Sequence, residues 1–448
     1  MRIRNLSLFI VLVALLASCQ SVQQAQSPEE WSKNAVIYEV NVRQYTPQGT
    51  FNAFTTHLPQ LKELGANILW FMPIYPISRE ARKGTLGSYY AVKDYNKVNP
   101  EFGNAEDFRA LVQKAHEMGF KVILDWVANH TGRDNAWVTQ HPDWFVKDSL
   151  GRILSPFDWT DVAKLDYKNK AMREAMQDAM AYWVKEFDVD GFRCDVAGEV
   201  STDFWDDTRA KLDKIKPVFM LAEADKAELT QKAFHADYNW PLLSTMNDIA
   251  KGKKVAADID ILLAHHDSLY SPASFKMNFV TNHDENSWNG SEYERMGAGT
   301  NAFVVLTYTY PGMPLIYTGQ EVGLKKRLSF FEKDTVANWN NPGVFTFYQK
   351  LNELKHSQAA LAVGKNGGKF IRYATTNKDL YIFERKAKGS RVLVVLNLSD
   401  QNRMVNFTMS KPGGVFTDYF QNMKTDISRL EGATLLPWQY KVYVSNAK

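Results

Sequence analysis

Cysteine is nearly absent from this chain: its 448 residues include only Cys19 and Cys194. Cys19 lies in an apolar leader and Cys194 in a predicted buried strand, so a disulfide-based scaffold is excluded. Long apolar runs are also missing, because no segment after the leader approaches the roughly 20 apolar residues of a membrane-spanning helix. Basic runs are missing as well, and a net charge of +3 gives no reason to expect a nucleic-acid partner.

Aromatic residues, in contrast, are plentiful. They make up 13% of the chain and include 12 Trp and 20 Tyr. Sugar rings stack on such flat apolar faces, but the same side chains also fill protein cores, so composition leaves both interpretations open. The hydrophobic fraction of 45% and the charged fraction of 23% are typical of a soluble globular protein. The length fits one large domain plus a small one.

The leader has the pattern of an export signal. Two arginines precede the apolar run Leu6–Leu16, which is too short to span a bilayer. The run ends in Leu16–Cys19, which resembles a bacterial lipobox, where small residues before a cysteine allow cleavage and lipidation of that cysteine. We predict a lipoprotein signal peptide over 1–18, lipidation of Cys19 and a flexible tether over 19–30. An ordinary signal peptide with an incidental cysteine is the alternative.

Short β-branched or aromatic runs alternate with longer helical patterns from Trp31 onward. The predicted strands are Val36–Val40, Asn67–Met72, Lys121–Val127, Gly191–Asp195, Pro217–Glu223, Ala236–Tyr238, Lys276–Thr281 and Pro314–Thr318. This alternation predicts an α/β fold, a (β/α)8 TIM barrel, with an open doubly wound sheet as the second choice.

Two segments do not follow this alternation. Residues 129–167 follow the third strand and are rich in Asp, Trp and Pro, so we predict a small excursion domain there. Beyond about Gly364 the strand-like runs are separated by turn signals, which predicts a C-terminal antiparallel β-sandwich over 365–448. The barrel domain, with its excursion, is then expected over 31–364.

Polar side chains collect at the C-terminal ends of the predicted strands, where barrels of this type place reactive groups. Arg193 and Asp195 alone fit a buried ion pair that only orients strands as well as they fit a catalytic pair. Carboxylates, histidines and an arginine from well-separated segments together favour chemistry. The predicted rim carries Tyr89, Tyr90, Asp94, Asp125, Asn129, His130, Arg193, Asp195, Glu223, His283 and Asp284.

Retaining glycoside hydrolysis needs such a set, with one carboxylate as nucleophile and a second carboxyl group as acid and base about 5–5.5 Å away. Asp195 and Glu223 end consecutive strands, and neighbouring strands lie about 4.8 Å apart. We expect Arg193 to keep the pKa of Asp195 low, which suits a nucleophile. Asp225 competes with Glu223 for the second role, but Glu223 directly follows the apolar run of its strand.

Several short segments of the predicted barrel resemble motifs of one enzyme family, the α-amylase family, which is family 13 of the glycoside hydrolases. Four of them follow in the family's order, and another is similar to the family's segment after the second strand. The four are Asp125–His130, Gly191–Ala197, Glu223 with its preceding strand, and Phe279–Asp284, and the other is Gly87–Tyr95.

The resemblance implies roles for individual residues. Asp195 would be the nucleophile, Glu223 the general acid and base, and Asp284 a third carboxylate that fixes the sugar. The sugar-binding residues would be Tyr90, His130, Arg193 and His283, with Tyr90 stacking under the sugar ring. Asp94, Asp125 and Asn129 are interpreted as supports of the rim.

The chain departs from the family around calcium. Members with the common calcium site often carry an aspartate where this chain has Lys164, and Lys-His where it has Gly198 and Glu199. An ammonium group cannot replace an oxygen ligand, so the usual site looks incomplete. We therefore predict no metal site and no required cofactor, with calcium elsewhere as the alternative. The Lys164 version is more similar to the neopullulanase and cyclomaltodextrinase branch.

The resemblance implies an enzyme that cleaves α-1,4-glucosidic bonds in starch or malto-oligosaccharides through a covalent glycosyl-enzyme, and the lipobox predicts that it is lipid-anchored. The alternatives are a 4-α-glucanotransferase, a cyclomaltodextrinase or neopullulanase-like enzyme, and a non-catalytic glucan-binding lipoprotein. The expected partners are an α-glucan substrate and a membrane that holds the lipid anchor. That membrane would be the outer membrane or cell surface, with the periplasmic face as the alternative. The sequence leaves the oligomeric state open.

Overall fold

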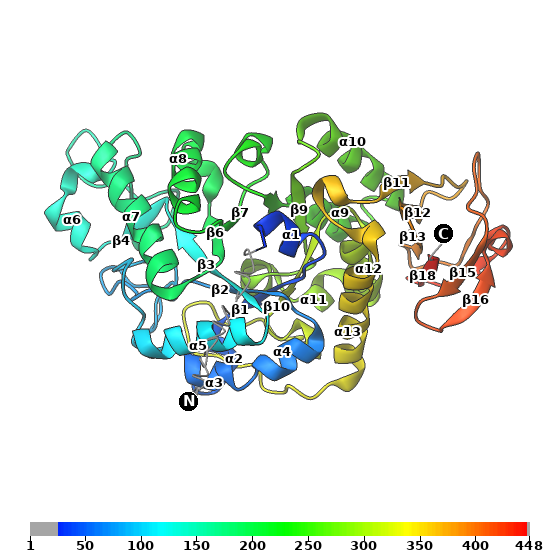
Figure 1. The fold of residues 1–448 in the computed structure, drawn as a ribbon, viewed down its shortest axis with the longest axis horizontal. Coiled ribbons are helices and arrows are strands. Elements are labelled where there is room, and N and C mark those ends of the chain that lie inside the picture. The colour runs from blue at the N-terminus through cyan, green and yellow to red at the C-terminus, as the bar shows by residue number, and fades with distance from the viewer. Residues whose placement is uncertain (1–25, 446–448) are drawn as a thin grey trace, which may run out of the picture.

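The computed structural model describes residues 26–445 and shows a closed barrel with a separate sheet at one end of the molecule (Figure 1). Eight parallel strands pair in the order β1-β10-β9-β8-β7-β6-β3-β2, which confirms the predicted (β/α)8 barrel. The strands are β1 (Ile37–Val40), β2 (Ile68–Phe71), β3 (Lys121–Val127), β6 (Gly191–Asp195), β7 (Phe219–Ala222), β8 (Ala236–Tyr238), β9 (Phe275–Asn278) and β10 (Met313–Tyr317).

Helices surround the barrel (Figure 1). In α5, an Asn104–Asp107 capping box fixes the start, and buried apolar residues at helical spacing form the stripe that faces the strands. None of the helices within 26–445 is long and apolar enough to cross a membrane. They are α1 (Pro28–Ser32), α2 (Val42–Tyr45), α3 (Phe51–Thr55), α4 (Leu58–Leu64), α5 (Ala105–Glu117), α6 (Ala136–Gln140), α7 (Lys170–Phe187), α8 (Thr202–Asp213), α9 (Trp240–Ala250), α10 (Ile259–Leu269), α11 (Glu292–Met296), α12 (Thr300–Thr309) and α13 (Pro342–Ser357).

The first described helix, α1, packs at the N-terminal end of the barrel. Its Glu29 carboxylate lies 3.2 Å from His235 Nε2, and the Trp31 ring lies 5.5 Å from the ring of Phe219 at the start of β7. Residues 28–30, which we assigned to the flexible tether, therefore begin a docked helix instead. The predicted signal peptide and the lipidation of Cys19 lie outside the described residues.

The predicted excursion after the third barrel strand forms one wall beside the strand ends. Its two short strands, β4 (His130–Gly132) and β5 (Val162–Lys164), pair antiparallel. The Gly132 backbone N–H donates to the Val92 carbonyl at 2.8 Å, which ties the excursion to the segment after β2. A small cluster of Ile77, Ala91 and Val162 is buried between them.

The C-terminal part contains a six-stranded antiparallel sheet with the order β11-β12-β13-β18-β15-β16 and a two-stranded sheet of β14 and β17. Alternate residues of β12 face two different cores: Tyr381 and Phe383 pack toward the barrel, while Leu380 and Ile382 pack toward the small sheet. The strands are β11 (Lys369–Arg372), β12 (Leu380–Ala387), β13 (Ser390–Asn397), β14 (Arg403–Met404), β15 (Val415–Asp418), β16 (Met423–Asp426), β17 (Thr434–Leu435) and β18 (Tyr440–Ser445).

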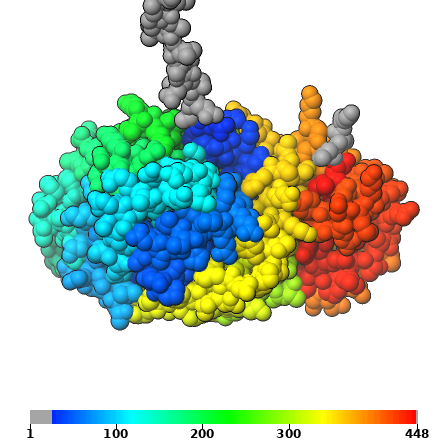
Figure 2. Space-filling model, turned by 60° about the horizontal axis from the view of Figure 1, so that its bottom comes forward, coloured from blue at the N-terminus to red at the C-terminus, as the bar shows by residue number. Residues whose placement is uncertain are grey.

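Helices α12 and α13 lie between the barrel and this C-terminal sheet (Figure 1). In the surface view, the orange and red C-terminal residues gather at one end of the molecule, beside the yellow segment that holds α13 (Figure 2). The Phe303 ring of α12 lies 5.8 Å from the Trp438 ring of the C-terminal part. This packing gives the sheet a buried face against the barrel.

Candidate active site

A cleft of about 650 Å³ opens at the C-terminal ends of the barrel strands. Of the seven catalytic and sugar-binding residues predicted from the sequence, six line this cleft, and Arg193 lies fully buried beneath it. The six are Tyr90, His130, Asp195, Glu223, His283 and Asp284.

The register of β6 and β7 places Asp195 directly opposite Glu223. Cys194 pairs with Ala222, and the Glu223 backbone N–H donates to the Cys194 carbonyl at 3.0 Å. Neighbouring strands lie about 4.8 Å apart, so the two carboxyl groups stand side by side at the rim. Gly191 permits this pairing, because a Cβ atom there would lie 1.9 Å from the Phe219 carbonyl oxygen.

Arg193 holds the carboxyl groups from below. Its Nη1 lies 2.8 Å from Asp125 Oδ1 and 3.3 Å from Asp195 Oδ1, and its Nη2 lies 2.9 Å from Glu223 Oε2. Its Nε donates to the Tyr238 hydroxyl at 3.0 Å. One guanidinium therefore spaces the two opposed carboxyl groups, since its planar fork offers donors in fixed directions.

The expected low pKa of Asp195 is contradicted. Burial raises the pKa of Asp195 well above its usual range, the Glu223 carboxylate adds to the rise, and Arg193 offsets only part of it. The Asp195 side chain keeps 11% exposure toward the cleft, so water still reaches it. The prediction considered only the arginine two residues away, whereas Glu223 and Asp125 compete for the same cation.

A strained backbone position supports Glu223. Val196 follows the nucleophile candidate and has φ 37° and ψ 43°, a left-handed conformation that costs energy for a β-branched residue. In this conformation the Val196 backbone N–H donates to Glu223 Oε2 at 2.7 Å. Glu223 Oε2 thus combines one backbone hydrogen bond with the ion pair to Arg193, and nothing in the sequence signals the backbone donor.

His283 connects the far side of the cleft to the floor. Its Nδ1 lies 2.5 Å from Glu39 Oε1, and its Nε2 lies 2.7 Å from the Tyr90 hydroxyl and 3.3 Å from Asp284 Oδ2. Burial disfavours the imidazolium, but Asp284 and Glu39 outweigh it and raise the pKa of His283 to about 9. His283 therefore carries a positive charge beside Asp284 at neutral pH.

Tyr90 and His130 differ from His283 in being neutral. The Tyr90 hydroxyl donates to Asp125 Oδ2 at 3.0 Å, and its ring stacks on Phe330 with an interplanar angle of 14°. Burial lowers the pKa of His130 to about 3, so its imidazole stays uncharged. His130 lies edge-on to the Trp159 ring at 5.5 Å, on the excursion side of the cleft.

Some functional candidates were not found from the sequence. Glu39 and Tyr238 belong to the buried floor. The aromatic side chains at the rims come from segments outside the barrel strands, where no strand end marks them; Trp159, Trp288, Phe330 and Phe331 all line the cleft. Asp125 is not a rim residue but a buried floor residue. Asp94 pairs with Lys97 at 2.9 Å, and Asp225 turns to Lys276 at 2.6 Å, so neither reaches the cleft.

The loop after β10, which carries Phe330, is pinned by Gln44 of α2. The buried Gln44 Nε2 donates to the carbonyls of Ser329 at 2.7 Å and Glu332 at 2.8 Å, and its Oε1 accepts from the Asp334 N–H at 2.5 Å. Gln44 therefore positions one aromatic wall of the cleft from outside it.

The region of the family's usual calcium site offers a poor set of ligands. Lys164 lies opposite His130 in the pairing of β4 and β5, and Asn129 is buried with its amide 3.4 Å from His130 Nδ1. Within the described residues, no cluster of three or more His, Cys, Asp or Glu side chains could hold a metal ion. The residues present do not fit that site.

Two opposed carboxyl groups on adjacent barrel strands, both in contact with one guanidinium and open to a cleft, are the arrangement that a retaining glycoside hydrolase needs. The family model for the α-amylase catalytic domain matches residues 24–160 and 144–341. The chain therefore belongs to the α-amylase family, as its motifs indicated.

Similar proteins cover nearly the whole chain. Alpha-amylase 3 of Dictyoglomus thermophilum is 26% identical over 95% of this chain and 96% of its own length. A cyclomaltodextrinase of Thermoanaerobacter pseudethanolicus is 26% identical over 84% of this chain and 72% of its own length. The crystal structure of an α-amylase from Lactobacillus plantarum has a TM-score of 0.82 and 31% identity, and covers 92% of this chain and 99% of its own.

Proposed function

We propose that this enzyme hydrolyses α-1,4-glucosidic bonds of malto-oligosaccharides with retention of configuration, with Asp195 as nucleophile and Glu223 as acid and base. The observation that carries the proposal is the placement of these two carboxyl groups opposite one another on β6 and β7, both in contact with Arg193. Asp284, across the cleft beside charged His283, is the third carboxylate.

The reaction proceeds in two displacements. The Asp195 carboxylate attacks the anomeric carbon and forms an ester, while the bond to the leaving sugar breaks and the Glu223 proton moves to its oxygen. Water then gives a proton to the Glu223 carboxylate and attacks the same carbon, which breaks the ester and restores Asp195. Burial and the neighbouring Glu223 carboxylate both raise the pKa of Asp195, and Arg193 opposes this rise.

The remaining predicted residues bind the sugar in this proposal. The Tyr90 ring, backed by Phe330, offers a flat face for the sugar ring in the central position. His283 donates as an imidazolium, and neutral His130 offers a hydrogen bond without adding charge. Arg193 acts from below as the group that spaces the two carboxyl groups.

We infer that short or cyclic α-glucans are preferred over long starch chains. The similarity to a cyclomaltodextrinase supports this preference, as does Lys164 in the segment that resembles the neopullulanase branch. Both rims of the cleft carry aromatic side chains, and Lys83 pairs with Asp161 at 3.2 Å along one edge. Such a bordered cleft favours substrates of few sugar units.

Transfer to a second sugar is the other candidate, because an exposed aromatic platform lies at the mouth of the cleft. Trp288 is 52% exposed, and its ring lies 5.1 Å from Phe330 and 5.7 Å from Phe331. A sugar stacked there would present a hydroxyl to the glycosyl-enzyme in place of water.

Incubation with maltoheptaose, β-cyclodextrin, pullulan and soluble starch, followed by product chromatography, tests the proposal. We expect cleavage of maltoheptaose and the cyclodextrin faster than starch, with new reducing ends. Redistribution of chain lengths without new reducing ends would instead support transfer. In either case Asp195→Asn should reduce the rate by about 10⁴-fold or more, and an Asp195→Asn enzyme as active as the wild type would contradict the mechanism.

We also propose that the mature protein is a membrane-anchored lipoprotein, lipidated at Cys19. The support is the Leu16–Cys19 lipobox alone, which lies outside the described residues. Metabolic labelling with palmitate should mark the expressed wild-type chain and not Cys19→Ala. Label on both chains, or on neither, would overturn this assignment.

A further inference from the structure

A second cavity of about 500 Å³ lies where the segment between β8 and β9 meets the C-terminal sheet. None of its lining residues lines the active-site cleft. Its walls come from α10, the turn before β10 at Tyr310–Gly312, the glycine-rich segment Gly364–Gly368, and β11 and β12. Ligand sites commonly form at such junctions between domains, and we call this cavity the junction pocket.

Arg385 of β12 brings an unpaired charge to the junction pocket. Arg385 is only 3% exposed. Its Nε donates to the Gly368 carbonyl at 3.1 Å, and its Nη1 donates to the Thr309 carbonyl at 3.3 Å. Among the described residues, no carboxylate oxygen lies within 4.0 Å of it, and Nη2 makes no hydrogen bond. A buried cation without a counter-ion is costly, and burial accordingly lowers the pKa of Arg385 to about 10.

Tyr310 adds a second unused donor on the same wall. It is 3% exposed, yet within the described part of the chain its hydroxyl has no hydrogen-bond partner. Buried hydroxyl groups are nearly always paired, so an unpaired one on a residue that lines a cavity points to a ligand or water. Tyr310 also lies close enough to Arg385 to act on its charge.

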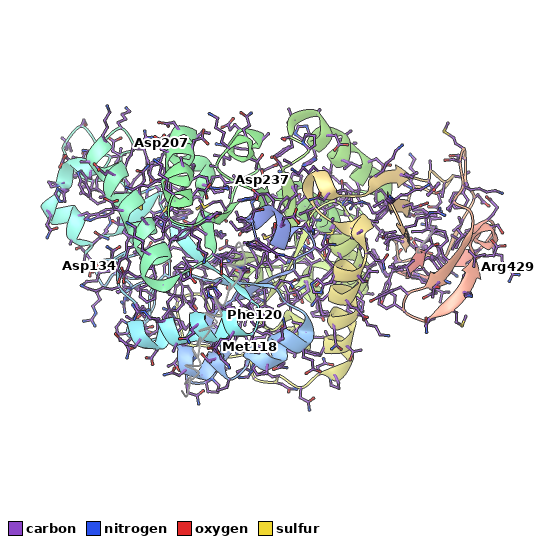
Figure 3. The ribbon with its side chains drawn as sticks, in the orientation of Figure 1. Met118, Phe120, Asp134, Asp207, Asp237 and Arg429 are labelled. Carbon is purple, nitrogen blue, oxygen red and sulfur yellow. The ribbon has the colours of Figure 1, made fainter. Side chains whose placement is uncertain are left out.

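The carboxylates near the junction pocket contact partners other than Arg385. Asp225, which lines the pocket, and Asp237, which does not, both pair with Lys276, at 2.6 and 2.8 Å, and Asp237 is labelled in Figure 3. Asp267 lies 3.4 Å from Nδ1 of its neighbour His266. Three cations line the pocket, Lys276, Lys365 and Arg385, against the two carboxylates Asp225 and Asp267, so the lining keeps a net positive charge.

We propose that the junction pocket binds a small oxyanion, a carboxylate or phosphate group, through Arg385 Nη2 and the Tyr310 hydroxyl. Gly367 leaves room for it, because a Cβ atom there would lie 3.1 Å from Nη2. The anion would join the barrel to the C-terminal sheet, since Tyr310 precedes β10 and Arg385 belongs to β12. Binding to the folded state alone raises its stability with the logarithm of ligand concentration once that concentration exceeds Kd.

Thermal unfolding of the full chain in inorganic phosphate, acetate or chloride at equal ionic strength tests the site. We expect the Tm to rise with the logarithm of phosphate or acetate concentration, and not to rise with chloride. The anion that raises the Tm shows whether the pocket takes a phosphate or a carboxylate group. Tyr310→Phe removes only an unpaired hydroxyl, so it should fold normally and bind about tenfold more weakly. Tyr381→Phe is the matched control, because Tyr381 also has a buried unpaired hydroxyl but does not line the pocket.

Isothermal titration of phosphate and of acetate into the wild type, Arg385→Lys and Tyr310→Phe measures binding without relying on unfolding. Loss of affinity in both variants, with wild-type affinity in Tyr381→Phe, supports the site. No saturable binding of either anion to the wild type, or equal affinity in the wild type and Tyr310→Phe, would overturn it.

Discussion

Arg193 organises the floor of the cleft at the scale of single residues. It contacts Asp125, Asp195 and Glu223 at once and lies 5.0 Å from the Trp70 ring centroid. No water reaches it, so its charge balances buried carboxylates that would otherwise repel one another. Removing one partner of a buried ion pair leaves the other charges uncompensated.

Replacing Arg193 with Met should therefore lower the free energy of unfolding by about 3–5 kcal/mol. Arg193→Lys should recover part of this loss but little activity, because an ammonium group cannot reach two carboxylates with fixed geometry. Urea unfolding and kcat measure the two effects. The control is Arg152→Met, since Arg152 pairs with Asp148 at the surface and is worth at most about 1 kcal/mol. An equal loss of unfolding free energy in Arg193→Met and Arg152→Met would contradict this role of Arg193.

His283 should make the free energy of unfolding decrease as the pH rises from 6.5 through 9. The structure raises its pKa from 6.5 to about 9, so its contribution is fully present below pH 6.5 and is lost as pH rises through 9. The free energy of unfolding of the wild type should fall by about 3 kcal/mol more than that of His283→Gln across this window. Urea titrations at several pH values measure it.

His130→Gln provides the control for that series. Burial lowers the pKa of His130 to about 3, so it does not titrate between pH 6.5 and 9. Its variant should keep the wild-type slope of stability against pH. A His283→Gln enzyme with the wild-type slope would show that His283 is not charged in the folded state.

At the scale of elements, the loop after β10 forms a cleft wall without regular structure. Its three hydrogen bonds to Gln44 hold Phe330 under Tyr90. Gln44→Leu removes these bonds while nearly preserving shape, so the wall should loosen. We expect KM for maltoheptaose to rise about tenfold, with a smaller change in kcat.

Gln349→Leu is the control for this loop, because Gln349 bonds to the Glu63 carbonyl at the surface, away from the cleft. Steady-state kinetics on maltoheptaose and on a short activated maltoside compare KM and kcat between Gln44→Leu and Gln349→Leu. If Gln44→Leu leaves KM unchanged for both substrates, the loop does not depend on this contact.

The barrel strands could be predicted because they are short, fully buried apolar runs between turn signals. Lys121–Val127, Gly191–Asp195 and Ala236–Tyr238 have the expected bounds, and the others differ by a few residues at their ends. Helix α13 was not assigned, although Asn341 and Pro342 mark its start as a Pro-initiated helix. Its outer face is mixed in polarity, so the apolar period is weak.

The candidate site could be predicted only where a strand end carries a polar residue. Asp195 and Glu223 follow that rule. Trp288, in contrast, lies in the short π-helical turn Glu285–Asn289, and Phe330 lies in an irregular loop whose path depends on tertiary contacts such as those of Gln44. The pKa of Asp195 was predicted in the wrong direction for a related reason. Burial is the largest cause of the raised pKa and the Glu223 carboxylate the next, and neither follows from the residues beside Asp195 in the sequence.

For the whole molecule, the positions that would hold the family's usual calcium carry Lys164 and no matching acidic cluster among the described residues. We therefore expect chelation with EDTA to leave both the Tm and the activity unchanged. The comparison of EDTA-treated enzyme with and without added CaCl₂ checks this. Activity that is lost in EDTA and restored by CaCl₂ would reveal a calcium site built from other residues.

The central claim is that Asp195 carries the sugar during the reaction, and trapping that species tests it most directly. Glu223→Gln treated with α-maltosyl fluoride should become glycosylated, because fluoride leaves without a proton, and should hydrolyse the ester slowly because the base is missing. Peptide mass spectrometry should find one maltosyl unit on the peptide that contains Asp195. A maltosyl unit on the peptide of Asp284, or an unlabelled enzyme that releases the inverted anomer, would contradict the account.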